Sequence, residues 1–254
     1  MARSAAYTGF EGVTLGAYGV ASGGSGAVSG VQLNGYIRQN SEDRPYGVAN
    51  DFVASTLGAM IGLPVPPIAL VSLPGGEVGS VSLGFGERGV QPPPADLDAL
   101  ARAHPEEAAG TIVFDQWICN PDRHDENIAF LAKKGMSLFD HDGALIGHKP
   151  PVSASDNLTR GQSYIVCAHP LAQHIEDWRL IEGWISEVRR LSKRSIQRVA
   201  ERAYDSRLVT APERDGLVQM LTYRASSLSA MMENRAGDFT KVVQPAMTQG
   251  GDSE

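Results

Sequence analysis

The most informative stretch of this chain is Asn120-Pro-Asp-Arg-His-Asp-Glu-Asn127, which is followed after a short interval by Phe139-Asp-His-Asp142. Between them, residues Ile128 to Leu131 and Met136 to Phe139 have the apolar character of two short strands joined by a turn. A hairpin of this kind places the end of its second strand next to the residues that precede its first strand. We therefore expect the carboxylate of Asp140 to lie beside the polar loop.

The residue types in these two segments match the needs of phosphoryl transfer. That reaction requires a carboxylate that accepts or orients the proton of the acceptor hydroxyl, oxygen ligands that hold Mg²⁺ on the phosphates, and cations that offset negative charge. Asp122 is the candidate base, and Asn127 and Asp140 are the candidate metal ligands. Arg123 and His124 complete the candidate catalytic set, in which His124 either orients Asp122, contacts the transferred phosphate or packs the loop onto the core.

The composition is that of an ordinary globular protein. Of 254 residues, 42% are hydrophobic and 20% are charged, which excludes collagen-like, coiled-coil and wholly disordered chains. The net charge of -7 argues against a dedicated nucleic-acid or anionic-membrane binder. Cys119 and Cys167 are too few for a disulfide framework, and neither a membrane span of ~18 apolar residues nor the apolar core of a signal peptide is recognisable. We therefore expect a cytoplasmic protein with reduced thiols.

The first third of the chain is rich in glycine and in β-forming residues. The expected elements are strands at residues 13–20, 31–39, 68–73 and 78–85 and a helix at residues 48–61. The Gly/Ser-rich run from Ala21 to Gly30 joins the first two strands. This pattern predicts a β-rich N-lobe over residues 1–85. Residues 86–94 are rich in glycine and proline, which neither a helix nor a central strand accepts, and they form the expected hinge.

Helical patterns dominate the remainder of the sequence. The expected helices are residues 96–104, 105–118, 177–191, 193–207 and 211–233, while residues 142–174 are expected to be irregular. These elements predict an α-helical C-lobe over residues 95–233. The last segment, residues 234–254, is polar and rich in glycine and glutamine, and we expect a disordered tail.

The order Asp-Arg-His-x-x-Asn, followed by a strand pair that ends in an apolar residue and Asp-His, resembles the HipA-like kinase domain and the wider phosphatidylinositol 3/4-kinase superfamily. The resemblance extends to the segment from Asn50 to Pro67, which ends in Leu-Pro-Val-Pro-Pro, and to Phe114-Asp-Gln-Trp-Ile-Cys-Asn-Pro-Asp-Arg-His124. It covers residues 15–232 approximately. It implies an α+β, bilobal protein-kinase-like fold that binds ATP and Mg²⁺ between its lobes.

The same resemblance implies an ATP-dependent phosphotransferase that acts like a HipA-like serine/threonine kinase. The implied acceptor is a protein hydroxyl, while the wider superfamily also suggests a lipid or small-molecule hydroxyl. The glycine-rich loop would then hold the phosphates through Ser22, Gly23, Gly24, Ser25 and Gly26, since residues without a side chain let backbone N–H groups approach an anion. A hairpin loop with only a structural role is the alternative.

One departure from the family pattern concerns the cation that contacts the nucleotide phosphates. The family carries a lysine on the strand after the loop, but this chain has no lysine before Lys133, and Arg38 stands in the expected place. Arginine keeps the charge but differs in geometry from an ammonium group. The acidic partner implied on the following helix is Asp51, one methylene shorter than the expected glutamate. The pair is either mutually compensating or a sign of weakened catalysis.

Two further hypotheses follow from these observations. The missing lysine suggests a pseudokinase that binds nucleotide or a partner without turnover. The His141-Asp142 pair, with Asp122 and His124 nearby in sequence, suggests a metal-dependent phosphohydrolase. A basic stretch from Arg189 to Arg202 is either a solvated surface or a docking site for an acidic partner protein, and no segment predicts nucleic-acid binding by this chain itself.

Overall fold

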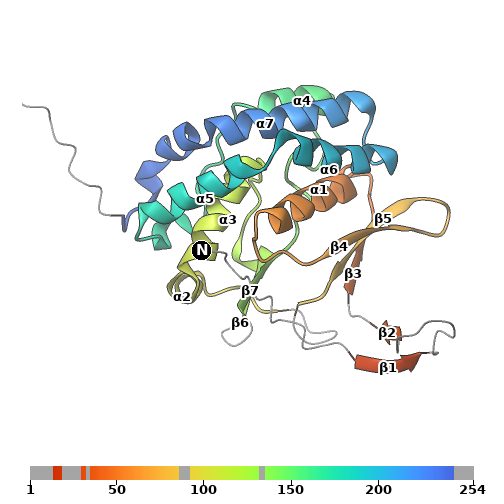
Figure 1. Cartoon of the computed structure of the whole chain (residues 1–254), viewed down its shortest axis with the longest axis horizontal. Helices are drawn as coiled ribbons and strands as arrows, with labels where there is room; N and C mark the ends of the chain where they lie inside the picture. The colour runs from red at the N-terminus through yellow and green to blue at the C-terminus, as the bar shows by residue number, and fades with distance from the viewer. Residues whose placement is uncertain (1–13, 19–29, 33–34, 86–91, 132–134, 243–254) are drawn as a thin grey trace, which may run out of the picture.

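The computed structural model describes residues 14–18, 30–32, 35–85, 92–131 and 135–242. Small antiparallel sheets and helix α1 form one part of the molecule, and a larger group of helices forms the other (Figure 1). This α+β arrangement in two lobes is the predicted fold class. Within the described part of the chain, no helix combines the length and the apolar character needed to cross a membrane.

The strands form three antiparallel sheets. In the first, β1 (Thr14–Tyr18) pairs with β2 (Gly30–Gln32). In the second, β5 (Val78–Leu83) lies between β3 (Gly35–Arg38) and β4 (Ile68–Ser72), so that Arg38 is opposite Ser80. The expected continuous strand at residues 31–39 is therefore divided between two sheets, because β2 and β3 have different partners.

Helix α1 (Gly47–Met60) connects the second sheet with the helical part of the molecule. It contacts β4 and β5 on one side and α6 on the other, and eleven of its residues are buried. Such burial on all sides explains why it lacks a polar face. The chain then turns at Gly62, whose φ of 85° suits glycine, and proceeds into the proline run that prevents further helix.

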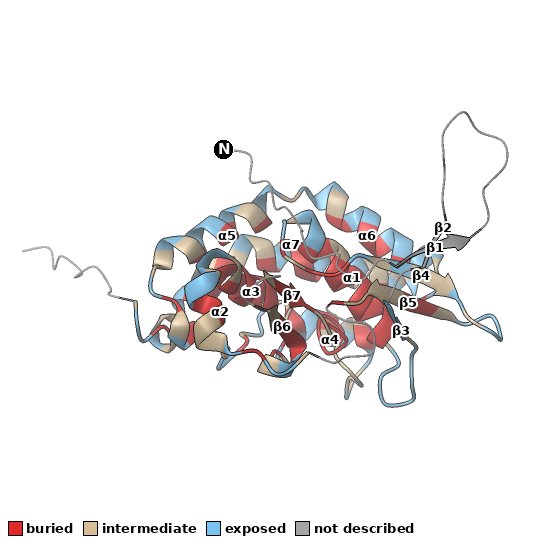
Figure 2. Cartoon of the chain, turned by 90° about the horizontal axis from the view of Figure 1, so that it is seen from below, coloured by how far each residue is buried: buried red, intermediate tan, exposed pale blue. Residues whose placement is uncertain are grey.

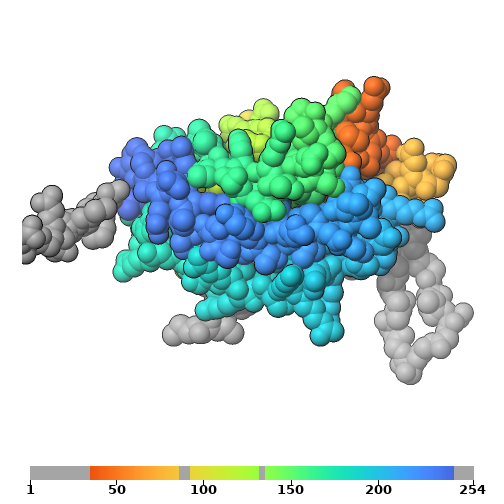
Figure 3. Space-filling view, turned by 90° about the horizontal axis from the view of Figure 1, so that it is seen from above, coloured from red at the N-terminus to blue at the C-terminus, as the bar shows by residue number. Residues whose placement is uncertain are grey.

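The larger part is built from helices whose ends follow the signals in the sequence. The helices are α2 (Leu97–Ala103), α3 (Pro105–Trp117), α4 (Ala154–Gly161), α5 (Trp178–Arg190), α6 (Lys193–Asp205) and α7 (Ala211–Glu233). Asp177 and Ser192 cap α5 and α6, and Thr210 with Glu213 forms a capping box at the start of α7. In the view from above, α7 runs across the helical face and is flanked by α4 and by α5 and α6, all of which it contacts (Figure 3).

Most core side chains belong to one cluster that spans both lobes. Buried residues lie on the inward faces of the helices, and exposed ones face outward (Figure 2). Arg224 of α7 is fully buried, and its guanidinium donates hydrogen bonds to the backbone oxygens of Gln116, Trp117, Gly161 and Tyr164. This satisfied charge ties α7 to the end of α3 and to α4.

Two differences from the expected organisation have local causes. Helix α4 lies within the segment expected to be irregular, and it begins where the hydroxyl of Ser153 accepts a hydrogen bond from the backbone of Asp156. The described chain also continues past residue 233 to Val242, because Phe239 is buried against the ring of Trp178. Residues 243–254 and most of the expected hinge, residues 86–91, lie outside the described residues. The other lobe limits stay predictions.

Between α3 and α5, close packing at Gly110 provides a test of this arrangement. A Cβ on Gly110 would lie 2.5 Å from the Trp184 ring, whereas a Cβ on Gly183 of α5 would meet nothing within 4 Å. We expect Gly110→Ala to lower the free energy of unfolding by about 1–3 kcal/mol because the core there is overpacked. Gly183→Ala should raise it by about 0.5–1 kcal/mol through helix propensity. Urea denaturation measures both, and an unchanged Gly110→Ala variant would contradict this packing.

Candidate active site

A buried arginine joins the two polar segments identified in the sequence. Arg123 donates two hydrogen bonds to the carboxylate of Asp115 in α3, with N–O distances of 2.8 and 3.0 Å. It donates two more to the backbone oxygens of Asn127 and Phe139, at 2.9 and 3.0 Å. Asp115 also contacts His169, and its pKa is well below the usual range because Arg123 and His169 outweigh the effect of burial. The four hydrogen bonds of Arg123 thus fix the loop against the end of the hairpin.

The loop itself is short and internally bonded. The side-chain nitrogen Nδ2 of Asn127 donates a hydrogen bond to the backbone oxygen of Asp122 at 2.9 Å. The backbone N–H of Phe139 donates one to the backbone oxygen of Asn127 at 3.3 Å. The side chain of Asp122 is 45% exposed, so it is accessible to a molecule in solution. His124 is partly exposed, with Glu126 at 4.0 Å as its closest charged contact.

Strands β6 (Ile128–Leu131) and β7 (Gly135–Leu138) form the expected hairpin, and Phe139 separates its end from Asp140. The φ of Asp140 is 57°, a left-handed conformation that aspartate adopts more readily than most residues. Its carboxylate accepts a hydrogen bond from Arg38 at 2.6 Å. Burial and the neighbouring carboxylates raise the pKa of Asp140, although Arg38 opposes that change. A non-glycine residue held in this conformation is typical of functional sites.

Arg38, at the end of β3, faces three carboxylates. Its guanidinium lies 2.6 Å from Asp140, 2.5 Å from Asp142 and 3.4 Å from Asp51 of α1. Burial would lower the pKa of Arg38, but the charges of these carboxylates outweigh that effect and raise it. The guanidinium therefore remains charged. His141 is fully buried beside this group, with its Nδ1 atom 3.7 Å from Oδ1 of Asp51 and 3.2 Å from the hydroxyl of Ser55, and with its ring edge against Phe114.

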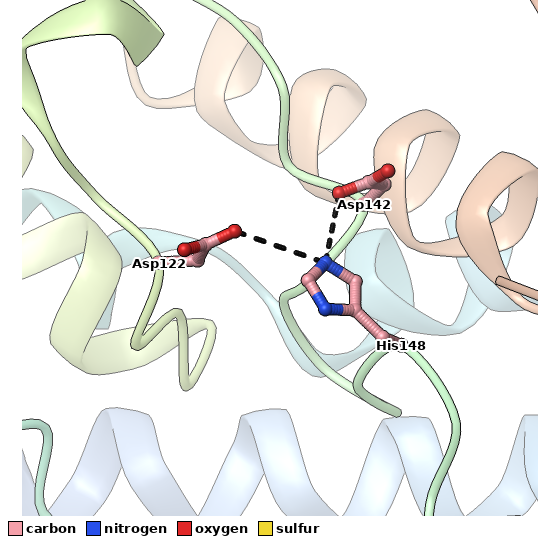
Figure 4. Close-up of side chains that lie close together, drawn as sticks. All are labelled: Asp122, Asp142 and His148. Carbon is pink, nitrogen blue, oxygen red and sulfur yellow. Dashed lines mark hydrogen bonds and ion pairs between the residues drawn. The ribbon is translucent and has the colours of Figure 1, made fainter. Parts of the chain in front are cut away.

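Asp142 connects two groups of side chains because each of its carboxylate oxygens has different partners. Oδ2 accepts hydrogen bonds from Arg38 and Arg44, and Oδ1 lies 3.1 Å from Nε2 of His148. Burial would raise the pKa of Asp142, but the hydrogen bond from Arg44 and the charge of Arg38 lower it overall. Nε2 of His148 also lies 3.8 Å from Asp122, so these three side chains converge (Figure 4).

A cavity of about 560 Å³ lies between the β3–β5–β4 sheet and the end of β7. Arg38, Asp51 and Asp140 form part of its wall, and its apolar lining comes from Tyr36, Ile37, Pro66, Leu83, Phe85 and Phe139. Its volume is within the range typical of small-molecule sites. The cavity therefore combines apolar walls with a charged end that faces Asp142.

The structure brings Arg38, Asp51 and Asp140 into one cluster, and Asp142 links that cluster to Asp122. The side-chain nitrogen of Asn127 donates a hydrogen bond to the backbone oxygen of Asp122, and not to its carboxylate. The predicted phosphate-binding residues Ser22, Gly23, Gly24, Ser25 and Gly26 lie outside the described residues.

Sequence reasoning missed two members of the site, Arg44 and His148. Arg44 lies in a turn before α1, in which its backbone N–H donates to the backbone oxygen of Ser41. His148 follows the hairpin, after the turns that begin at Asp142. Neither residue belongs to a motif with fixed spacing, so the only available signal was the proximity of His148 to Asp142 in the sequence.

Together, the two-lobed α+β fold, the cleft with its cation and carboxylates, and the loop joined to a hairpin define a kinase-like architecture. No family model matches the sequence, and the comparison with curated proteins finds no match either. Among solved structures, the Helicobacter pylori proinflammatory kinase CtkA matches with a TM-score of 0.57 and 14% identity, covering 92% of this chain and 98% of that chain. HipA of Shewanella oneidensis MR-1, solved with HipB and operator DNA, matches with a TM-score of 0.37 and 14% identity, covering 75% of this chain and 57% of that chain.

The likeness to CtkA over nearly the full length of both chains confirms the predicted fold. The chain has the kinase-type α+β fold that its resemblance to the HipA-like kinase domain implied.

The buried pair of Arg123 and Asp115 provides a prediction about stability. Removing one partner leaves an uncompensated buried charge, so Arg123→Ala should lower the free energy of unfolding by about 3–5 kcal/mol. The matched control is Arg102→Ala at the surface pair with Asp98, which should change it by less than about 1 kcal/mol. Urea denaturation followed by circular dichroism measures both values. Equal effects of the two substitutions would show that Arg123 does not hold the loop.

Proposed function

We propose that this chain is an ATP-dependent phosphotransferase that resembles HipA-like serine/threonine kinases. The observation that carries the proposal is the convergence of Arg38, Asp140 and Asp142 at one end of a cavity of nucleotide size. Its apolar lining suits a purine ring, and the guanidinium of Arg38 suits phosphate oxygens. ATP would lie with its phosphates toward Arg38 and toward the Gly/Ser-rich loop that precedes β2.

Arg38 takes the place that the family gives to a lysine, and Asp51 takes that of the acidic partner. The distance of 3.4 Å between them supports the interpretation that the longer cation compensates for the shorter acid. A guanidinium has several N–H groups in one plane, which lets Arg38 contact Asp51, Asp140 and Asp142 at once. When a nucleotide binds, a change in the side-chain conformation of Arg38 would direct some of these N–H groups to a phosphate.

The donors at this end of the cavity fit Mg²⁺, because carboxylate and amide oxygens are the ligands it prefers. Asn127 and Asp140 would hold the ion, which would neutralise charge on the phosphates during transfer. Asp140 is only part-buried, and its carboxylate faces the cavity that the nucleotide would enter.

Asp122 would act on the acceptor. Its exposed carboxylate would orient the acceptor hydroxyl and take its proton while the oxygen of that hydroxyl bonds to the γ-phosphorus and ADP leaves. Arg123 would position the loop, since its donors are directed to Asp115 and to two backbone oxygens. The proposed acceptor is a serine or threonine hydroxyl of a protein, with a lipid or small-molecule hydroxyl as the alternative.

The second candidate is a pseudokinase that binds nucleotide without turnover, favoured by the absence of the lysine. Arg38 and Arg44 both bind Oδ2 of Asp142, which suits a stable, inactive arrangement. The phosphohydrolase hypothesis lacks such support, because its required ligand His141 is fully buried beside Phe114 and Ser55. A cytoplasmic location and a separate partner protein stay predictions.

Nucleotide binding is tested by thermal unfolding with Mg²⁺ and ATP. A ligand that binds only the folded state at a hundred times its Kd stabilises it by about 2.7 kcal/mol, so the Tm should rise. Asp140→Ala should reduce the rise because an Mg²⁺ ligand is lost, and Glu182→Ala on the exposed face of α5 should retain it. If Mg²⁺ and ATP leave the Tm of the native protein unchanged, the proposed function is wrong.

Substitutions of Arg38 and Asp51 test whether the chain is an active kinase or a pseudokinase. Charged hydrogen bonds contribute about 1.5–3 kcal/mol, so Arg38→Ala should weaken ATP and ADP binding tenfold or more and leave adenosine binding unchanged. Arg38→Lys alone should slow phosphate transfer, and the double exchange Arg38→Lys with Asp51→Glu should restore it.

Transfer from radiolabelled ATP to the protein itself or to a mixed protein acceptor measures the rate, and isothermal titration measures binding. Nucleotide binding without transfer in every variant would favour the pseudokinase.

A further inference from the structure

We propose that Asp122, Asp142 and His148 form a binding site for a divalent transition metal ion, separate from the Mg²⁺ position assigned above to Asn127 and Asp140. The three side chains come from the loop before β6, from the end of the β6–β7 hairpin and from the segment that follows it (Figure 4). One ligand atom from each lies within 4.8 Å of the others.

The distances between these atoms are close to those of a metal site. Ligands at about 2.1 Å from a metal ion are separated by about 3.0 Å in octahedral and about 3.4 Å in tetrahedral geometry. Nε2 of His148 lies 3.1 Å from Oδ1 of Asp142 and 3.8 Å from Oδ2 of Asp122. Asp122 is 45% exposed, so its side chain has room to close the longer distance by a rotamer change.

Gly143 provides an independent indication that this convergence is built into the chain. A Cβ at position 143 would lie 2.8 Å from Nε2 of His148 and 3.4 Å from Cβ of Asp122. Any other residue would therefore push the imidazole out of the space between the two carboxylates. The φ of Gly143 lies outside the range that L-residues avoid, so close approach accounts for the glycine here better than backbone conformation does.

The two carboxylate oxygens of Asp142 have different partners. Its Oδ2 atom binds Arg38 and Arg44, while Oδ1 contacts Nε2 of His148, a contact that an ion bound to both atoms would replace. The four carboxylates of Asp51, Asp122, Asp140 and Asp142 surround two guanidinium groups. The carboxylates therefore outnumber the guanidinium groups, which favours the binding of cations here.

The chemistry of the three ligands selects the class of metal. Mg²⁺ prefers oxygen ligands alone, whereas one imidazole with two carboxylates suits Mn²⁺, Fe²⁺ or Zn²⁺. Three protein ligands leave coordination positions open, as in catalytic metal sites, and two of them, Asp122 and His148, are partly exposed. The open positions face the loop that carries Asp122, so that, if the proposed kinase function holds, the ion would lie beside the acceptor hydroxyl.

The experiment is a titration of the full chain with Mn²⁺ in the absence of nucleotide. Electron paramagnetic resonance of free Mn²⁺ gives the affinity, and electron spin echo modulation from ¹⁴N reports coordination by an imidazole. The native protein should bind Mn²⁺ and show the nitrogen signal. His148→Ala should remove that signal and weaken binding at least tenfold, and Gly143→Ala should weaken binding because it displaces the imidazole.

Two further variants complete the test. Asp140→Ala should keep the nitrogen signal, because Asp140 belongs to the other site, and His174→Ala should behave as the native protein because His174 contacts Asp98 instead. Circular dichroism verifies that each variant is folded. Absence of binding to the native protein at about 1 mM Mn²⁺, a nitrogen signal that survives in His148→Ala, or its loss in Asp140→Ala would each overturn the proposal. Because no nucleotide is present, any of these results is distinguishable from a failure to bind ATP.

Discussion

The buried contact between Arg123 and Asp115 sets the geometry of the whole cleft. Asp122 and Asp140 belong to the two segments that flank the β6–β7 hairpin, which places these segments side by side. Arg123 joins these segments by donating to the backbone oxygens of Asn127 and Phe139, and Asp115 in α3 anchors its charge in the core. A buried charge is tolerated only when it is paired and its donors are satisfied, and here every bond that satisfies Arg123 also fixes the cleft. The requirement for stability and the requirement for positioning are therefore met by the same hydrogen bonds.

A second constraint acts across the lobes through Arg38. One guanidinium contacts Asp51 in α1 together with Asp140 and Asp142 after the hairpin, so the sheet, the helix and the loop share one electrostatic centre. The pKa values of Asp140 and Asp142 move in opposite directions, upward and downward, although the two residues are separated by only one position. The difference arises because Asp142 has Arg44 and His148 as additional partners, whereas burial and the neighbouring carboxylates outweigh the effect of Arg38 at Asp140.

The helices and the β6–β7 hairpin could be predicted because their signals are local. Pro105, Ser192 and the pair Thr210 and Glu213 mark helix starts that the structure reproduces. The features that could not be predicted depend on contacts between distant segments. The division of the expected strand at residues 31–39 follows from the choice of partners, and Arg44 enters the site because α1 places its preceding turn against Asp142. Ser153, which caps α4, is a local indication of a helix start, but the irregular composition of residues 142–174 led to the prediction of irregular structure there.

The departures of this chain from the family pattern form a coupled set. Replacing a lysine by Arg38 adds N–H donors, and the structure matches them with Asp142, an acceptor beyond the implied pair of Asp51 and Asp140. Asp142 is almost fully buried, so its second oxygen also needs a partner, and His148 supplies it. A Cβ on residue 143 would lie 2.8 Å from Nε2 of His148, so the glycine leaves room for the imidazole in this position. A continuous set of polar contacts thus leads from Arg38 through Asp142 and His148 to the carboxylate of Asp122.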